Sequence, residues 1–182
     1  MSGPVIKLND DTYAKMEQAI QETFSLVLGL NLQRTDFYLG SVKNPPKHIS
    51  GYSVLKNPMT RGIFSIGFPP ETAFRIFSSF YGAAIDQIDD RVIEGIGELT
   101  NMIYGCLKKQ FNDEGFDLEM YVPYVLVQDK FCDFSDFGPG KAVTLHFGTS
   151  VGAFWVELKL NKKIKSKKPK PAKLSSQRKK AA

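Results

Sequence analysis

The sequence has few of the features that mark secreted or membrane-spanning proteins. Its 182 residues include two cysteines, Cys106 and Cys132, which are too few for a disulfide framework. No apolar run approaches the roughly 20 residues that span a bilayer, and the first ten residues lack the apolar segment of a signal peptide. We therefore expect a cytoplasmic protein with reduced thiols, and a chain long enough for one domain with its own core.

Patterns that bind metals are also scarce. The two histidines, His48 and His146, lie far apart in the sequence and show no zinc-ligand spacing. Asp129, Asp133 and Asp136 cluster near a Gly-Pro-Gly sequence, a composition that is typical of a surface turn. We expect no metal and no cofactor bound by this chain.

Positive charge is concentrated at one end of the chain. Residues 161–182 hold ten of the 24 lysines and arginines and no acid, so residues 1–160 carry 14 basic and 19 acidic side chains, a net charge of −5. The basic segment has hardly any apolar residues and cannot bury enough surface to offset its ordering entropy. We predict a folded domain over 1–160 and a disordered basic tail over 161–182. The tail would add solubility, or contact nucleic acid or anionic surfaces nonspecifically.

Hydrophobic periodicity predicts a mixture of helices and strands. Three- and four-residue spacing indicates one helix that is capped by Asp10 or Asp11 and ends near Gly29, followed by helices over 69–82 and roughly 88–112. Strand-like runs occupy five segments: 48–56, 61–69, 116–127, 141–148 and 152–160.

The order of these elements favours an α+β fold, in which helices pack on an antiparallel or mixed β-sheet. The passage between the first helix and residue 48 is rich in turn residues and predicts no strand. In the last run, Trp155, Glu157 and Lys159 alternate with apolar residues, which predicts a half-buried strand.

The helix predicted over 88–112 has an apolar stripe and a sharply defined polar face. At 100° per residue, the stripe consists of Val92, Ile96, Leu99, Ile103 and Leu107. On the opposite side, four residues fall within about 60° of one another, namely Glu94, Glu98, Asn101 and Gly105.

Glycines surround this polar face, although each glycine in a helix interior costs about 1 kcal/mol relative to alanine. Gly105 lies on the face itself, while Gly95 and Gly97 flank its start. Glu98 and Asn101 alone would indicate only a solvated face, but such a face would be better served by Ala, Lys or Gln at the glycine positions. The missing side chains instead favour close approach by another macromolecule.

These residues resemble the motif of the CheC/CheX family of chemotaxis phosphatases. The family pattern is Asp or Ser, three residues, Glu, two residues, Asn, and then 21 residues to Pro. Glu98, Asn101 and Pro123 match this spacing, and Glu94 stands where the family has Asp or Ser. The likeness covers roughly residues 10–160 and is greatest to the CheX branch, because the first helix has Ile20 where a second motif copy would need Asn.

The resemblance implies that the chain dephosphorylates a CheY-type response regulator. Asn101 would position the attacking water, since a carboxamide both donates and accepts hydrogen bonds. Glu98 would bind the lysine beside the regulator's phospho-aspartate, and Glu94, Gly97 and Gly105 would contact the partner. The divalent metal, Mg²⁺, is expected on the regulator.

Two functions stay open at this point. The first is a hydrolase of two-component chemotaxis signalling, acting as a homodimer as the resemblance implies. The alternative is a non-catalytic module of the same fold that binds a receiver domain or a flagellar-switch partner.

Overall fold

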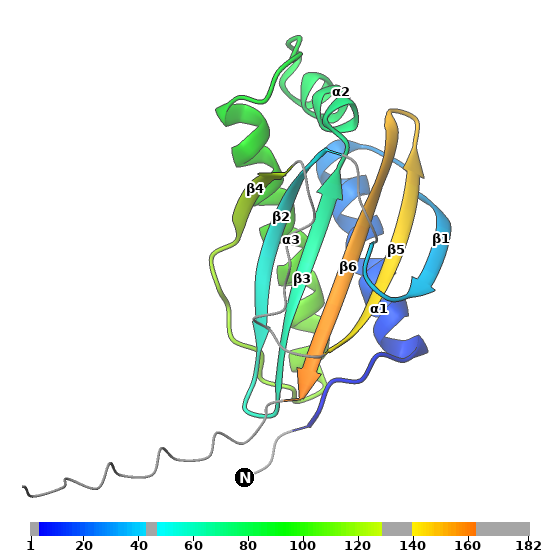
Figure 1. The fold of residues 1–182 in the computed structure, drawn as a ribbon, viewed down its shortest axis with the longest axis vertical. Coiled ribbons are helices and arrows are strands. Elements are labelled where there is room, and N and C mark those ends of the chain that lie inside the picture. Colours follow the sequence, from blue (N-terminus) through cyan, green and yellow to red (C-terminus); the bar gives the residue numbers. More distant parts are fainter. Residues whose placement is uncertain (1–3, 43–46, 129–139, 163–182) are drawn as a thin grey trace, which may run out of the picture.

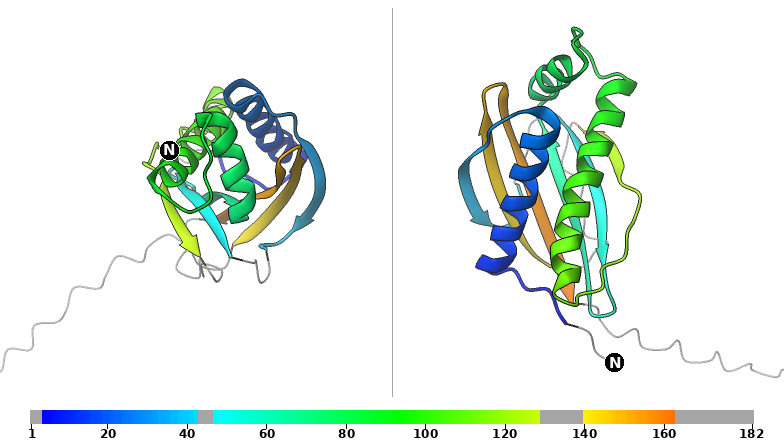
Figure 2. Two further views of the ribbon diagram at one scale, coloured as in Figure 1. Left: turned by 90° about the horizontal axis from the view of Figure 1, so that it is seen from above. Right: turned by 180° about the vertical axis from the view of Figure 1, so that it is seen from behind.

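Two long helices lie side by side on one face of an antiparallel sheet in the computed structural model, which describes residues 4–42, 47–128 and 140–162 (Figures 1 and 2). The helices are α1 (Asp10–Thr23), extended by the π-helical turn η1 (Phe24–Leu28), then α2 (Pro70–Tyr81) and α3 (Asp90–Asp113). The strands are β1 (Gln33–Leu39), β2 (His48–Lys56), β3 (Thr60–Phe68), β4 (Tyr124–Gln128), β5 (Lys141–Thr149) and β6 (Gly152–Lys162).

The six described strands form one sheet in the order β1-β5-β6-β3-β2-β4, and every neighbouring pair is antiparallel. The α+β fold expected from the sequence is therefore confirmed. Strands β1 and β4 are the two edges, and α3 lies close to β2 and β4. Within the described residues, no helix has both the length and the apolar character needed to cross a membrane.

Strand β1 was absent from the sequence-based prediction, so the expectation of five strands is wrong. This strand pairs only with β5, and six of its seven residues are exposed. Its register also shifts between Arg34 and Asp36. An edge strand that exposes both faces to water has no alternation of apolar and polar residues, and this alternation is the signal on which strand prediction depends.

Several predicted boundaries are shifted. Asn9, rather than Asp10 or Asp11, caps α1, because its side chain accepts a hydrogen bond from the Thr12 amide at 3.0 Å. The run predicted over 116–127 forms a strand only from Tyr124, directly after a proline. At the other end of the sheet, β6 continues to Lys162, which pairs with Thr60 and lies two residues inside the predicted tail.

Some predictions fall on residues that the structure does not describe. These are the basic tail from residue 163 onward and the acidic group in 129–139, together with Cys132. The tail and the acidic turn therefore stay predictions.

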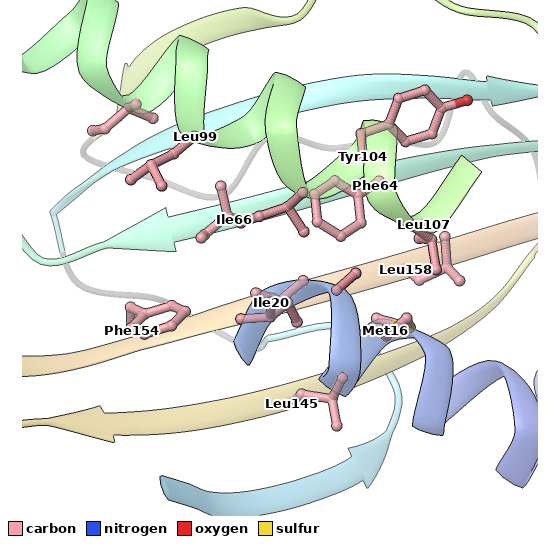
Figure 3. Close-up of a cluster of buried hydrophobic side chains, with 14 of the residues drawn as sticks. Met16, Ile20, Phe64, Ile66, Leu99, Tyr104, Leu107, Leu145, Phe154 and Leu158 are labelled. Atoms are coloured by element: carbon pink, nitrogen blue, oxygen red, sulfur yellow. The ribbon is translucent and has the colours of Figure 1, made fainter. Parts of the chain in front are cut away.

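The core lies between the sheet and the two long helices (Figure 3). From α1, Met16 and Ile20 point toward β5 and β6, while Leu99 and Leu107 of α3 cover Phe64 and its neighbours. The five stripe residues predicted for α3 are all buried, which confirms the helical periodicity.

The opposite face of β6 is more buried than the predicted half-buried strand would be. Glu157 is only 4% exposed, and its carboxylate accepts hydrogen bonds from Ser41 Oγ at 2.7 Å and from the Val42 amide at 3.1 Å. Burial raises the pKa of the Glu157 carboxyl, and these two hydrogen bonds oppose the rise. The alternation in the sequence identified the two faces of β6 but not the chain segment after β1 that binds Glu157.

Helix α3 packs closely on its neighbours because glycines stand at two contact points. A Cβ atom at Gly51 of β2 would overlap the side chain of Thr100, whose hydroxyl donates to the Ile96 carbonyl at 2.6 Å. A Cβ atom at Gly95 would overlap the buried Phe77 ring of α2. The glycine at position 95 is therefore explained by packing within the chain and not by clearance for a partner.

The two glycines of α3 at positions 95 and 105 make a matched test of this packing. Gly95→Ala should destabilise the fold by roughly 1–3 kcal/mol through overpacking, despite the better helix propensity of alanine. Gly105→Ala meets no atom within 4 Å and should stabilise it by up to about 1 kcal/mol. Urea midpoints of the two variants and the parent measure both effects. Equal shifts in the same direction would contradict this account of Gly95.

Candidate functional site

The start of α3 is fixed one turn before the polar face. Asp89 caps the helix, since its side chain accepts a hydrogen bond from the Val92 amide at 3.2 Å, and it forms an ion pair with Arg91 at 2.6 Å. The hydrogen bond from Arg91 is the main cause that lowers the pKa of the Asp89 carboxyl. A carboxylate at a helix N-terminus also interacts favourably with the positive end of the helix dipole. The cap sets where Glu94 and the residues after it point.

The polar residues predicted for the site lie together on the exposed side of α3. Glu94 and Glu98 are exposed, and Asn101 is partly exposed one turn after Glu98. In the part of the chain that the structure describes, the side chains of Glu98 and Asn101 form no hydrogen bond or ion pair. Their hydrogen-bonding capacity is therefore available to a ligand or partner.

The glycines of α3 differ in their surroundings. A Cβ atom at Gly105 would meet nothing within 4 Å, so the surface beside Asn101 is open on this side. A Cβ atom at Gly97 would lie 3.6 Å from Val125 Cγ2 of β4, which is an ordinary van der Waals contact. Neither position needs a glycine for packing inside the chain, in contrast to Gly95.

Two contacts place Pro123 beside Asn101. The chain before β4 runs antiparallel to α3, with Val125 next to Gly97 and with the Glu119 carbonyl accepting a hydrogen bond from the Tyr104 hydroxyl at 3.0 Å (Figure 2). Four helical residues rise about 6 Å, which matches about two residues of extended chain. Counting from the Gly97–Val125 contact, we infer that Asn101 and Pro123 lie at about the same level along α3.

A polar cluster fixes this segment at the far end of α3. Lys56 Nζ lies 2.7 Å from Glu119 Oε2 and 2.9 Å from the Tyr121 hydroxyl, which also donates to Glu119. Burial raises the pKa of the Tyr104 phenol, so this group stays a protonated donor at neutral pH. Sequence reasoning missed this cluster, because Lys56 and Glu119 are 63 residues apart.

The histidines and Cys106 lie away from the polar face of α3. The ring of His48 packs against Trp155 at 5.3 Å between centroids, and His146 lies at 6.4 Å from the same indole, on the sheet face opposite the helices. Burial lowers the pKa of His146. Cys106 packs against the core as a partly buried residue, as expected. Among the described residues, no group of three potential ligands is placed to hold a metal ion.

The site is an exposed helix face rather than a pocket. A shallow pocket does lie between α1 and β1, lined by residues that include Tyr13, Glu17 and Arg34, but Glu98 and Asn101 do not line it. A carboxylate and a carboxamide one turn apart on such a face can bind a cation and orient a water on a surface brought to them. This arrangement suits a protein partner better than a small molecule, which needs a concave site.

Part of the chain matches a known protein family. Residues 49–133 match the family model described as "Chemotaxis phosphatase CheX", a range that runs from the second residue of β2 past the end of β4 and includes all of α3. No relative among curated protein sequences matches the chain.

The fold is similar to those of several solved structures. A CheC-like superfamily protein from Shewanella sp. PV-4 has a TM-score of 0.76 at 23% identity, covering 85% of this chain and 99% of that one. For the chemotaxis protein CheX from Vibrio vulnificus the TM-score is 0.71 at 20% identity, with 83% and 99% covered. The CheX–CheY–BeF₃–Mg²⁺ complex from Borrelia burgdorferi gives 0.69 at 18% identity, with 84% and 99% covered.

Proposed function

Because residues 49–133 match the CheX family model and the fold is similar to solved CheC-like and CheX structures, we propose that this chain is a CheC/CheX-type phosphatase, which hydrolyses the aspartyl phosphate of a CheY-type response regulator. The observation that carries the proposal is the pair Glu98 and Asn101. Both side chains project from one exposed face of α3, with no partner among the described residues and with open space at Gly105. A receiver partner is also supported by the fold that this chain shares with the CheX–CheY complex.

In this mechanism the chain supplies positioning rather than covalent chemistry. Phosphoryl transfer depends on an in-line water and on stabilisation of the charge spread over the phosphoryl oxygens. The carboxamide of Asn101 accepts a hydrogen bond from the water and donates one without competing as a nucleophile. Holding a reactant in line in this way can supply a large part of the catalytic effect. The Mg²⁺ that neutralises the phosphoryl charge belongs to the regulator.

The remaining predicted residues shape the docking surface. Glu98 binds the lysine of the receiver as an ionised acceptor, and Glu94 adds a second negative charge one turn earlier on the same face. Gly105 and Gly97 remove side chains that would hold the receiver away from the helix. The proposal places the protein in the cytoplasm, where response regulators are phosphorylated.

We propose a homodimer as the working form. Among the described strands, β1 and β4 each have a neighbouring strand on one side only, and sheet edges are readily satisfied by pairing across a two-fold axis. Sedimentation velocity at micromolar concentration should report a dimer. A monomer under these conditions would contradict the proposal.

The strongest test of the mechanism is Asn101→Ala. The side chain is partly exposed and makes no hydrogen bond within the described residues, and alanine is the better helix former, so folding stability should be unchanged or slightly higher. Loss of a positioned polar group typically costs about 10²–10³-fold in rate, and the acceleration of receiver dephosphorylation should fall by that factor. The lifetime of the receiver phosphate, with and without the variant, measures the effect.

Lys109→Ala serves as the control, because Lys109 is exposed two turns further along the same helix. It should leave the rate within about twofold of the parent, as is usual for surface substitutions. An Asn101→Ala protein as active as the parent would exclude the phosphatase mechanism. It would favour the non-catalytic module that binds a receiver domain or a flagellar-switch partner.

Glu98→Gln tests the proposed ion pair separately from the water. The change keeps the shape of the side chain but removes its charge, and a hydrogen bond to a charged group contributes roughly 1.5–3 kcal/mol. The dissociation constant for a receiver carrying beryllofluoride should rise about 10- to 100-fold, and its dependence on salt should weaken. Asp113→Asn, which removes an exposed charge at the end of the same helix, should change neither quantity. Equal effects of both variants would indicate a general charge effect instead of a specific pair.

A further inference from the structure

Large apolar side chains remain exposed on α3 and β4, and Ile93 and Val127 are two of them. Ile93 is 37% exposed at the start of the helix, and Val127 is 45% exposed near the end of β4. Single exposed apolar residues are common on protein surfaces and need no explanation. These two residues come from different elements, however, and the packing of α3 against β4 places them in the same region.

The contact between Gly97 and Val125 defines how the two elements are aligned. Ile93 lies one helical turn before Gly97, and Val127 lies two residues after Val125 on the same side of β4. Because α3 and β4 run antiparallel, both steps lead in the same direction, away from Asn101 (Figure 2). Ile93, Gly97, Val125 and Val127 therefore form one apolar strip, called the α3–β4 strip below.

Because Gly97 has no side chain, nothing projects from the strip at the point nearest the polar face. A Cβ atom at Gly97 would meet only Val125, at 3.6 Å, so the chain has room for a larger residue at this position. A helix of this length would be more stable with alanine there. The absence of a side chain leaves Val125 partly uncovered between the exposed side chains of Ile93 and Val127.

We propose that the α3–β4 strip receives an apolar side chain of the phosphorylated receiver and determines which receiver is bound. This inference rests on the proposed function, since it assigns a second contact to the same partner. The strip is continuous with Glu94 and Glu98. The surface of the receiver that docks here would therefore carry an apolar residue next to a cationic one. The charged pair would supply orientation, while burial of the strip would supply most of the added affinity.

The test uses polar substitutions that preserve local structure. Ile93→Gln keeps a good helix former, and Val127→Thr keeps a β-branched shape. Binding is measured against a receiver carrying beryllofluoride and Mg²⁺, and kcat and KM against the phosphorylated receiver. For the Ile93→Gln/Val127→Thr double variant, Kd and KM should each rise about tenfold while kcat stays within twofold.

Leu26→Ser is the matched control, since Leu26 is 85% exposed in η1, outside the strip. It should bind the receiver as the parent does, and urea midpoints verify that every variant is folded. Strip variants that bind the receiver with the parent's Kd overturn the inference. So do strip variants that change sedimentation while receiver binding is unaffected, because the strip would then join two copies of this chain.

The binding measurement separates this inference from the proposed function. A parent protein that binds the receiver without hydrolysing its phosphate contradicts the phosphatase proposal. In that case the Kd values of the variants still test whether the strip binds the receiver. A parent protein that does not bind the receiver overturns both.

Discussion

The close approach of α3 to β2 is the contact on which the rest of the site depends. It is possible because Gly51 has no side chain where the Thr100 hydroxyl lies, and because that hydroxyl is satisfied by the Ile96 carbonyl within the helix. Thr100 immediately precedes Asn101. A Cβ atom at position 51 would lie 1.9 Å from the Thr100 hydroxyl oxygen, so a larger residue there would require α3, β2 or the Thr100 side chain to shift. The residue that packs α3 on the sheet and the residue proposed to position the water are therefore neighbours in one helical turn.

Within the described residues, the sheet, α2 and β4 all pack against α3. The sheet covers the apolar stripe, Phe77 of α2 lies against Gly95, and Val125 of β4 lies next to Gly97. The polar sector contains Glu94 and Glu98, which are exposed, and Asn101 and Gly105, which are partly exposed. The three glycines of this helix thus have three different roles. One allows α2 to pack, one borders β4, and one is open to solvent.

Much of this arrangement could be predicted from the sequence, since helical periodicity alone identified the buried stripe of α3 and the sector opposite it. The roles of the glycines could not be predicted, because Gly95 and Gly97 lie two residues apart and differ only in which element faces them. The nearness of Pro123 to Asn101 depends on how the chain returns along α3, which the Lys56–Glu119 contact fixes across 63 residues. Strand β1 was missed because its exposed side chains carry no periodic signal.

The proposed hydrolysis needs only two side chains of this chain, because the partner would supply the rest of the catalytic centre. Glu98 and Asn101 provide one charged acceptor and one neutral donor–acceptor group, and neither can stabilise the charge of a transferring phosphoryl group alone. The cations that this chemistry needs must therefore come with the substrate, and a phosphorylated receiver with its own lysine and Mg²⁺ would supply them. Under the proposed function, the exposed face of α3 would enter the active site of the receiver. On this account the catalytic centre is completed only in the complex, and the apolar contacts around α3 decide which partners complete it.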